Sequence, residues 1–567
     1  MRKEQRRPAT APSNPRIVGE RTWQRKLRRG SRVVPVTNPQ NVAGRKRKGV
    51  FVAAVLLALL ATGFATAMAG VLHDRSSAHA ISRSRLVSSR GRARYLVLIV
   101  LDGARPDYFG MTRLPNVDTL RAEGVQYTKA MDGILESETP SGHTTISTGS
   151  TPARDGILGF DWAQSDNDYS LFSPDVVRAG AMEHIMASAN VPTIAGLYKA
   201  RYPSAKVVAL SGHKYYAADP LGGPSADAIM YYQGSAQGTY IPVAIPGHVP
   251  PSGVLNAPGV TGPTIHGPLG NEDALATRLA IAAFKKMHQR ITLINYPEFD
   301  WPLGHVDGSD RGKTIRLMRS FDHDLGTIEA AYRRAGVLAQ TLFVITADHG
   351  MSPLKRFVPD TVFTNAVAQA GTKAPAVSYS TATYLWLSDT TRAHAVARNL
   401  LGANDPGIQS VYYLSVRGLP HYVHAGGSFV SSEVDSANKY LLGTLMNGHE
   451  PTIVAFCREG QSSINPSTDW KADHGGANWQ SQHIPLILEG PGIPQGQIQV
   501  QPAQLDDVAP TILTAMGVRP TGMEGHALTE ALTQTTAADR RARDAETAHV
   551  TPLVNALMAQ DVYESSH

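Results

Sequence analysis

The sequence predicts an α/β fold with a mostly parallel central sheet flanked by helices and with inserted cap segments. Short, continuous apolar runs recur along the chain, as they do in strands that are buried on both faces of a parallel sheet. Amphipathic segments of helical period lie between these runs, and alternation of strand and helix is typical of α/β proteins. The 567 residues, of which 42% are hydrophobic, can bury one large core or two smaller ones.

Each element is expected from its local pattern. The apolar runs predict strands at 95–101 and within 291–300, 341–350 and 483–492. The amphipathic segments predict helices at 116–124, 271–290 and 313–336. In the second helix acidic residues come early and basic residues late, which suits the helix dipole, and Gly336 suits a C-cap of the third. Segments 200–265 and 400–470 are rich in Gly, Pro, Ser and Tyr and are interpreted as insertions or as a cap over the sheet.

Charge and hydropathy set the N-terminal region apart from the rest. Residues 1–49 hold 15 Lys and Arg against 2 Asp and Glu, a balance of +13, so the remainder carries −6 of the total of +7. The basic tail has no apolar period and is predicted to be disordered. Residues 49–72 carry no charge and are long enough to span a bilayer, and the basic cluster 45–48 precedes them. By the positive-inside rule the tail then stays in the cytoplasm, and the mildly acidic body is exported.

The expected organisation has five parts. These are a basic disordered cytoplasmic tail (1–49), a transmembrane anchor or signal segment (50–72), a linker (73–93), a folded domain (94–530) and a C-terminal helical tail (531–567). The expected location is the cell membrane, with a single span and the folded domain outside the cytoplasm. Secretion after signal cleavage is the alternative, because residues 67–69 and 78–80 have the Ala-x-Ala pattern of cleavage sites. No nucleic-acid partner is expected, since a nucleic-acid-binding tail would not normally precede a membrane span.

Polar groups follow the predicted strands at the points where the strands end. They are Asp102 after the first strand, Asp300 and His305 after the second, and Asp348 and His349 after the third. Because ligands bind at the carboxyl ends of strands in open α/β sheets, we expect these side chains to meet at one edge. Converging carboxylates repel one another and require a cation. Asp and His without Cys favour zinc, with manganese or calcium as weaker options.

Three further features bear on the chemistry. His474, in an Asp-His-Gly-Gly loop just before the strand at 483, adds an imidazole near the same edge. The segment 137–145, SETPSGHTT, is crowded with hydroxyls, and its residues alone leave open whether it forms a turn, a helix cap or a nucleophile. Cys457 is the only cysteine, which excludes an intrachain disulfide framework and a thiolate metal cluster.

These motifs together resemble the alkaline phosphatase superfamily and, within it, the type I phosphodiesterase/nucleotide pyrophosphatase branch. The resemblance runs from about residue 95 to about residue 528. It is carried, in order, by LIVLDGARPD, TPSGHTTISTG followed by TPARDGI, the spacing of Asp300 and His305, TADHGM, ADHGG and the closing segment DDVAPTILTAMGVRPTGMEG. The resemblance implies an exported hydrolase of phosphate diesters and pyrophosphates. It implies small-molecule phosphate ester substrates and a phosphothreonine intermediate at a two-zinc site.

The resemblance also implies roles for individual residues. Thr139 matches the nucleophile, and Ser141 is the competing hydroxyl in the same segment. One zinc would be held by Asp300, His305 and His474, and the second by Asp102, Thr139, Asp348 and His349. Manganese or another divalent metal is the alternative to zinc. Structural roles are expected for His143, His483 and His526.

The chain departs from the family pattern at three places. Phe160 stands where nucleotide pyrophosphatases carry an Asn that holds a phosphoryl oxygen, and the spacing between Asp300 and His305 is one residue longer than expected. Lys214 matches a Lys that binds the phosphate dianion in certain bacterial phosphomonoesterases, which makes it a candidate substrate-binding residue, but their Arg partner would fall near Tyr216. Since a monoester dianion gains more from two cations than a diester does, an alkaline phosphatase-type phosphomonoesterase is the alternative. An alternative of another class is a non-catalytic binding protein on a hydrolase scaffold.

Overall fold

The computed structural model describes residues 91–566 apart from a few short segments. These segments are 165–166, 179, 236–237, 264–268, 428–429 and 466–467. The predicted basic tail, the membrane segment and nearly all of the linker lie outside the described residues and stay predictions. Within the described part of the chain, no helix combines the length and the apolar character needed to cross a membrane.

A sheet of ten strands forms the centre of the molecule, in the order β21-β2-β20-β10-β1-β9-β5-β6-β7-β8. Its strands are β1 (Tyr95–Leu101), β2 (Val125–Ala130), β5 (Val207–Ser211), β6 (Ala228–Gly234), β7 (Thr239–Ala244), β8 (Gly262–Pro263), β9 (Ile291–Tyr296), β10 (Thr341–Thr346), β20 (Leu486–Glu489) and β21 (Gln497–Ala503). The middle strands β10, β1, β9, β5 and β6 are parallel to one another. All residues of β5, β9 and β10 are buried, as continuous apolar runs require. The prediction of a mostly parallel sheet is therefore confirmed.

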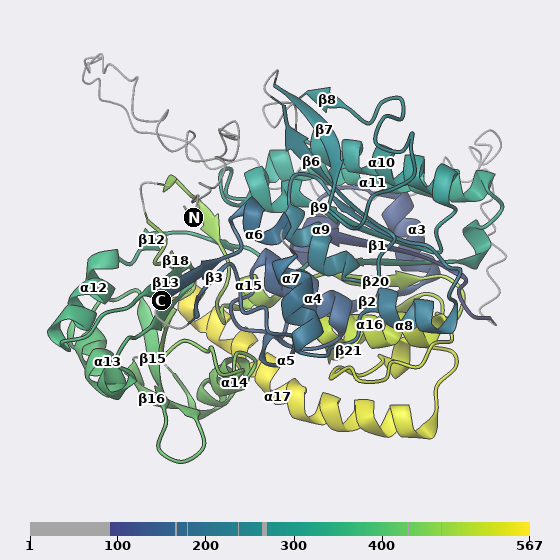
Figure 1. Cartoon of the computed structure of the whole chain (residues 1–567). Coiled ribbons are helices and arrows are strands. Elements are labelled where there is room, and N and C mark those ends of the chain that lie inside the picture. The colour runs from purple at the N-terminus through teal and green to yellow at the C-terminus, as the bar shows by residue number, and fades with distance from the viewer. Residues whose placement is uncertain are drawn as a thin grey trace, which may run out of the picture. The chain divides into compact units, whose positions relative to one another are not determined.

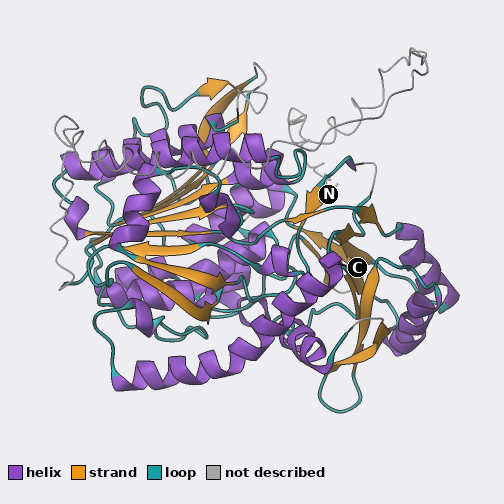
Figure 2. Ribbon diagram, turned by 180° about the vertical axis from the view of Figure 1, so that it is seen from behind, coloured by secondary structure: helices purple, strands orange, loops and turns teal. Residues whose placement is uncertain are grey.

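Helices cover both faces of this sheet (Figures 1 and 2). One face carries α10 (Asn271–Met287) and α11 (Arg311–Arg334), and the other carries α4 (Thr139–Thr148) and α16 (Val508–Ala515). The remaining helices of the body are α3 (Pro115–Glu123), α5 (Pro152–Asp155), α6 (Pro174–Arg178), α7 (Ala181–Ser188), α8 (Ile194–Arg201), α9 (Tyr215–Gly222), α14 (Ser432–Gly443) and α15 (Trp479–Gln482). The three helices expected from the sequence are present as α3, α10 and α11.

A second sheet of five antiparallel strands has its own apolar core. It contains β13 (Ala376–Tyr379), β14 (Ala382–Trp386), β15 (Ile408–Ser415), β16 (His421–Gly427) and β17 (Ile453–Cys457), with α12 (Asp360–Gln369) and α13 (Ala393–Gly402) packed on it. Segment 400–470 thus belongs largely to this sheet. Segment 200–265 was expected to be an insertion, and that interpretation is wrong, because it supplies β5 to β8 of the central sheet. Its Gly- and Pro-rich composition concealed one fully buried strand, VVALS.

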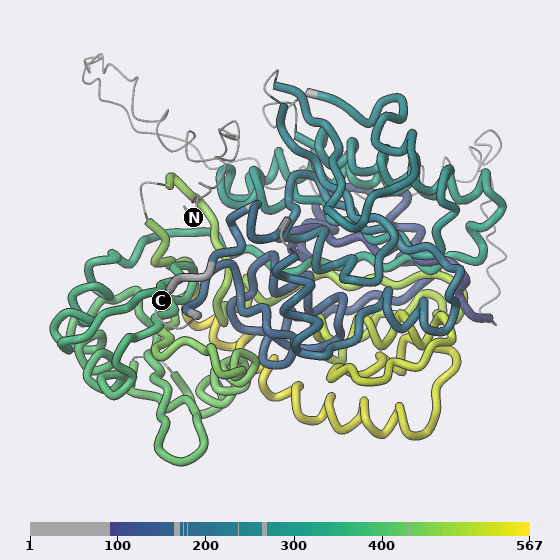
Figure 3. Tube along the Cα trace, in the orientation of Figure 1, coloured from purple at the N-terminus to yellow at the C-terminus, as the bar shows by residue number. Residues whose placement is uncertain are grey.

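The C-terminal segment is a long helix, α17 (Ala537–Ser566). Figure 3 follows it in yellow from the large sheet to the small one. Near its start Arg543, which is 2% exposed, forms ion pairs with Asp507, Glu530 and Glu546. Near its end Glu564 accepts a hydrogen bond from Gln409 of β15 at 2.9 Å. The helix is therefore bound to both parts of the body.

Candidate active site

Four neighbouring parallel strands deliver polar side chains to one edge of the central sheet. Asp102 follows β1, Asp300 follows β9, Asp348 follows β10 and Lys214 follows β5. These strands stand in the order β10-β1-β9-β5, so their carboxyl ends lie side by side. All four residues are 5% exposed or less. The edge therefore concentrates three buried carboxylates and one buried ammonium.

The predicted metal-ligating residues come together there in two adjoining groups. Ligand atoms of Asp300, His305 and His474 lie within 4.8 Å of one another, as do those of Asp102, Asp300 and His349. In the second group His349 Nε2 lies 3.6 Å from Asp102 Oδ1 and 3.5 Å from Asp348 Oδ2. The rings of His349 and His474 stack at 3.6 Å between centroids, which joins the two groups.

All three histidines are held in one orientation by backbone carbonyls. The Nδ1 of His305 lies 2.9 Å from Ala472 O, that of His349 2.9 Å from Gly350 O, and that of His474 2.8 Å from Ser137 O. A carbonyl at Nδ1 requires the proton there and leaves Nε2 as an acceptor. Each Nε2 then faces the carboxylates, which is the arrangement that metal-ligating histidines have in proteins.

The extra residue between Asp300 and His305 is absorbed by a wide turn. The backbone N of His305 donates to Asp300 O at 3.0 Å, which is a π-type, i to i+5 hydrogen bond. This turn returns His305 to the face of Asp300, so that His305 Nε2 lies 3.1 Å from Asp300 Oδ1. The unusual spacing therefore does not separate the two side chains.

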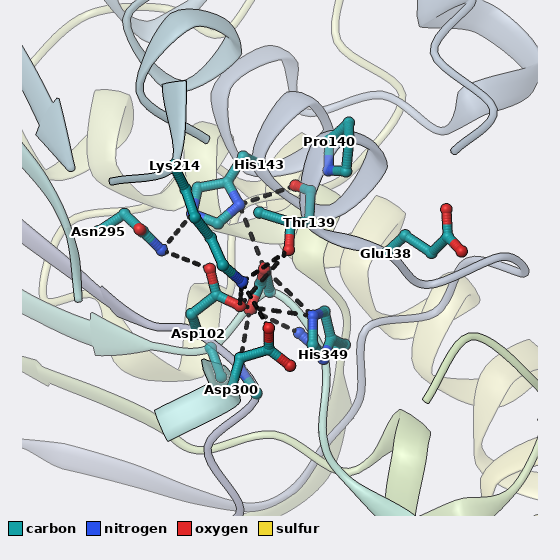
Figure 4. A network of polar contacts seen from close by, with 12 residues as sticks. Asp102, Glu138, Thr139, Pro140, His143, Lys214, Asn295, Asp300 and His349 are labelled. Atoms are coloured by element: carbon teal, nitrogen blue, oxygen red, sulfur yellow. Dashed lines mark hydrogen bonds and ion pairs between the residues drawn. The ribbon is translucent and has the colours of Figure 1, made fainter. Parts of the chain in front are cut away.

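Thr139 is the first residue of α4, and Glu138 is its N-cap. The hydroxyl of Thr139 lies 3.5 Å from Asp102 Oδ1 and 3.2 Å from Lys214 Nζ (Figure 4). The hydroxyl of Ser141 is used in backbone hydrogen bonds instead. It donates to Glu136 O at 2.8 Å and accepts from Glu138 N at 3.2 Å. The helix cap is thus formed by Glu138 and Ser141, and Thr139 is the hydroxyl that faces the carboxylates.

Lys214, the candidate substrate-binding residue of the sequence analysis, lies buried among the carboxylates. Its Nζ donates to Asp102 Oδ1 at 2.7 Å and to Asp300 Oδ2 at 2.6 Å (Figure 4). Burial opposes its charge, yet these two carboxylates raise the pKa of Lys214 well above its ordinary value. The ammonium therefore balances part of the negative charge of the site.

Two residues outside the predicted set support the carboxylates. Asn295 Nδ2 donates to Asp102 Oδ2 at 2.8 Å and lies 3.0 Å from His143 Nε2. His143, for which a structural role was expected, lies with its Nδ1 3.2 Å from Asp348 Oδ2 and 2.8 Å from Thr139 O. The sequence signal that we missed is an Asn near the end of the fully buried strand ITLINY.

The pKa values of the site reflect the close approach of its buried carboxylates and imidazoles. Burial, reinforced by Asp348, raises the pKa of Asp102 to about 6. Burial lowers the pKa of His349 to about 3, so its imidazole is neutral. Asp300 raises the pKa of His474 to about 9 against the effect of burial, so without a metal this imidazole is protonated, and a metal ion has to displace the proton from its Nε2. Carboxylates in such a dry cluster are stable only beside a positive charge.

Buried donor atoms without a hydrogen-bond partner indicate whether a metal fits these residues. Asp300 Oδ1, Asp348 Oδ2 and His349 Nε2 are buried and have no hydrogen-bond partner among the described residues. They are oxygen and imidazole nitrogen donors, the set that zinc accepts in proteins. The donors present therefore fit divalent metal ions of the zinc type.

An aromatic patch stands where the family pattern has polar groups. Phe160 stacks on Phe172 at 3.9 Å between centroids and meets the ring of Tyr216 edge-on at 4.8 Å. The backbone N of Phe160 donates to Glu138 Oε2 at 2.7 Å, so this patch adjoins the start of α4. Phe172 is 47% exposed, and the patch is accessible to a ligand.

Comparison with solved structures shows the same fold in phosphate-processing enzymes. The alkaline phosphatase PafA has a TM-score of 0.61 and 17% sequence identity, over 78% of this chain and 99% of its own. Murine ectonucleotide pyrophosphatase/phosphodiesterase 5, in a complex with AMP, has a TM-score of 0.53 and 15% identity, over 78% of this chain and 100% of its own. At these identities the likeness concerns the fold.

Sequence comparison shows the family. The alkaline phosphatase PhoK of Sphingomonas sp is 30% identical over 152 residues, which are 25% of this chain and 27% of that protein, so the match spans about a quarter of that relative. Residues 96–477 match the family of type I phosphodiesterases / nucleotide pyrophosphatases. This range is more than half of the chain. The chain belongs to the type I phosphodiesterase/nucleotide pyrophosphatase family of the alkaline phosphatase superfamily, as its motifs predicted.

Proposed function

We propose that the protein is an exported, metal-dependent hydrolase of phosphate diesters and pyrophosphates that acts through a phosphothreonine at Thr139. The observation that carries this proposal is the position of the Thr139 hydroxyl. It lies at the N-terminus of α4, 3.5 Å from Asp102 Oδ1, and faces a buried cluster of Asp and His. A threonine hydroxyl is a weak nucleophile unless a base or a metal activates it, and this cluster supplies the setting.

Two divalent ions, zinc with manganese as the alternative, are proposed as cofactors. Asp300, His305 and His474 would hold one ion, and Asp102, Thr139, Asp348 and His349 the other. Such ions would favour the alkoxide form of a bound hydroxyl and stabilise the attacking and leaving oxygens of an in-line displacement.

The chain's own residues supply the rest of the reaction. Thr139 Oγ1 attacks phosphorus, its bond to phosphorus forms and the bond to the leaving oxygen breaks, while the hydroxyl proton passes to solvent or to the leaving oxygen. Water then attacks the phosphothreonine and restores the hydroxyl, releasing the phosphoryl product. The dipole of α4 favours negative charge at this end of the helix throughout. Asn295 and His143 position Asp102 and Asp348 through the contacts described above.

The aromatic patch favours a diester over a monoester. Phe160 and Tyr216 bring no positive charge or amide to the phosphoryl group, and an exposed ring such as Phe172 suits the second substituent of a diester. Lys214 supplies one cation, but its ammonium is already shared by Asp102 and Asp300. The specific observation for the alternative, a phosphomonoesterase, is that Lys214 lies within the site at all. Two similar proteins, PhoK and PafA, are alkaline phosphatases, which is consistent with that alternative.

The test is a comparison of two substrates with matched variants. Zinc-loaded protein should hydrolyse bis-p-nitrophenyl phosphate faster than p-nitrophenyl phosphate, and a chelator should abolish both activities. Thr139→Ala should lose turnover. Thr145→Ala should keep it, because Thr145 is a buried threonine of the same helix whose hydroxyl has no hydrogen-bond partner among the described residues. Mass spectrometry of acid-quenched protein should find the phosphoryl group on Thr139.

Other outcomes select the alternatives. Preference for the monoester would support the phosphomonoesterase. Bound metal without turnover of either substrate would favour a non-catalytic binding protein, although all of the predicted ligand positions hold competent residues. A phosphoryl group on Ser141 would refute the choice of nucleophile.

The proposed location rests on the sequence alone. The segment 50–72 would anchor the protein in the cell membrane with the hydrolase domain (94–530) outside the cytoplasm, or would be removed on secretion. Cell fractionation and N-terminal sequencing of the mature protein separate the two. Recovery in the cytosolic fraction would contradict both. The expected partners are small phosphate esters and the membrane, and no nucleic acid.

A further inference from the structure

A small polar cavity of about 10 Å³ lies where the C-terminal helix α17 packs against α14 (Figure 1) and α15. A cavity of this volume holds about one water-sized particle. Its lining includes Asn438 of α14, Glu459 after β17, Asn478 just before α15, and Asp561 and Glu564 of α17. None of these residues belongs to the candidate active site.

Three side chains of the polar cavity each leave one buried oxygen without a hydrogen-bond partner among the described residues. These atoms are Asn438 Oδ1, Glu459 Oε2 and Asn478 Oδ1. The three residues are 8% exposed or less, so solvent does not replace the missing partners. An unsatisfied oxygen at such a depth is costly, and three around one cavity indicate a missing ligand.

Neighbouring hydrogen bonds fix the orientation of the two amides. Gln409 Nε2 donates to Glu564 Oε1 at 2.9 Å, so Gln409 presents its oxygen to Asn438 Nδ2. Asn478 Nδ2 lies 3.4 Å from Cys457 O, which can only accept. Turning either amide over would place oxygen against oxygen. The two unpartnered amide atoms are therefore oxygens.

A single water cannot satisfy this set of atoms. Water donates at most two hydrogen bonds, whereas the cavity presents three acceptors and holds about one particle. A cation can be coordinated by all three oxygens. Burial, reinforced by Asp561 and Glu564, also raises the pKa of Glu459 to about 7. A positive charge in the cavity would stabilise this carboxylate.

We propose that the polar cavity is a calcium site formed by Asn438 Oδ1, Glu459 Oε2 and Asn478 Oδ1. Ligands that are all oxygen favour a hard cation such as Ca²⁺ over zinc. Magnesium usually keeps several of its waters, for which the cavity has no room. Ca²⁺ takes about six to eight oxygens, and the carboxylates of Asp561 and Glu564 on the same cavity can supply others. The site does not depend on the proposed function.

The ion would join α17 to the segments that carry candidate metal ligands. Ser352, which follows the stretch with Asp348 and His349, donates its hydroxyl to Glu459 Oε1. Asn478 follows His474 in the same loop. Calcium should therefore stabilise the packing of α17 on these segments.

Calorimetry and thermal unfolding of the full-length protein test the site. Excess zinc fills the proposed zinc positions, and calorimetry should then detect one calcium ion per chain. Glu459→Gln removes the charged ligand and should weaken calcium binding about a hundredfold or more. Calcium should raise the Tm of wild type by a few degrees and leave that of Glu459→Gln unchanged. The control Glu433→Gln removes an exposed carboxylate of α14 outside the cavity and should behave as wild type.

Terbium, which replaces calcium at oxygen sites, reports the position of the ion. Trp479 lines the cavity, so excitation of its indole should sensitise Tb³⁺ luminescence in zinc-loaded wild type. Trp479→Phe should lose most of this luminescence, and excess calcium should remove it. These measurements need no turnover.

Three results would overturn the calcium site. A wild-type Tm that calcium leaves unchanged would mean that a proton on Glu459 and water satisfy the cavity. Equal calcium affinity of Glu459→Gln and wild type would exclude Glu459 as a ligand. Luminescence that survives Trp479→Phe would place the ion elsewhere, and this result is decisive even if Glu459→Gln fails to fold.

Discussion

Replacing Lys214 by methionine removes the one ammonium that balances the carboxylates of the site. Its Nζ lies 2.7 Å from Asp102 Oδ1 and 2.6 Å from Asp300 Oδ2. At an effective dielectric constant of about 20, each contact has a Coulomb energy of about 6 kcal/mol, most of which offsets desolvation. Removing one partner of a buried ion pair typically costs about 3–5 kcal/mol. Lys214→Met should therefore lower the free energy of unfolding of the metal-free protein by about 3–5 kcal/mol.

The same variant should bind zinc more tightly. A bound metal and the ammonium would share the carboxylates of Asp102 and Asp300, so we expect wild type to give up contacts of Lys214 when a metal binds. The variant lacks this cost, and about 3–5 kcal/mol corresponds to roughly a hundred- to a few thousandfold in affinity. In excess zinc the difference in unfolding free energy between variant and wild type should become small.

Urea denaturation with and without zinc, together with a chelator-buffered zinc titration, measures both effects. Lys199→Met is the control, because Lys199 pairs with Asp227 at 3.0 Å at a partly exposed position outside the site. Lys199→Met should lower the free energy of unfolding by about 1 kcal/mol or less and leave the zinc affinity unchanged. Unchanged or weaker zinc binding by Lys214→Met would refute the idea that the ammonium stands where a metal binds.

Three further changes test the site and its surroundings. Asn295→Ala removes the hydrogen bond to Asp102 Oδ2 and should weaken zinc binding about 10- to 100-fold in a metal titration. An unchanged zinc affinity would show that Asn295 does not position Asp102. Gly142→Ala would place a Cβ 2.6 Å from Asp348 O and so displace Asp348, a proposed zinc ligand. Zinc affinity should therefore fall, while circular dichroism still shows a folded protein. Full retention of zinc binding would show that Asp348 is not displaced. Burial, with Glu183 nearby, raises the pKa of Asp219 to about 8, so between about pH 4 and 8 the native state holds a proton that the unfolded chain has lost. Stability should fall as pH rises through this window by up to about 1.4 kcal/mol per unit, and Asp219→Asn should remove that slope in urea titrations at several pH values; parallel curves for both proteins would refute it.

The parts of the fold that were predicted correctly depend on local pattern. Strands β1, β9 and β10 were visible as continuous apolar runs because both faces of each strand are buried, so no polar alternation interrupts them. The polar residues that follow them had to meet, because parallel strands that neighbour one another end at the same edge. Asp102, Asp300 and Asp348 were found on this ground.

Other features depend on contacts between segments that are distant in the chain, and they could not be predicted from the sequence. Strand β5 is short and lies within a Gly- and Pro-rich stretch, and its place beside β9 follows only from the pairing of Val207 with Ile291. Strand β20 has the apolar run of a parallel strand, yet it pairs antiparallel with β10. Composition cannot distinguish the two directions, because burial on both faces selects the same residues in each.

The sequence by itself determined which donors the protein has, in what order, and which family it belongs to. Asp and His at strand ends, a hydroxyl-rich segment and the absence of cysteine partners are properties of the residues and their spacing. The tertiary structure decided how these groups are used. It placed Lys214 between Asp102 and Asp300, turned the Nε2 of each histidine inward, and brought α17 against α14 and α15 to form the polar cavity. These arrangements are long-range because an ion pair or a cavity depends on which segments the folded chain brings within a few ångströms, and no local pattern records that.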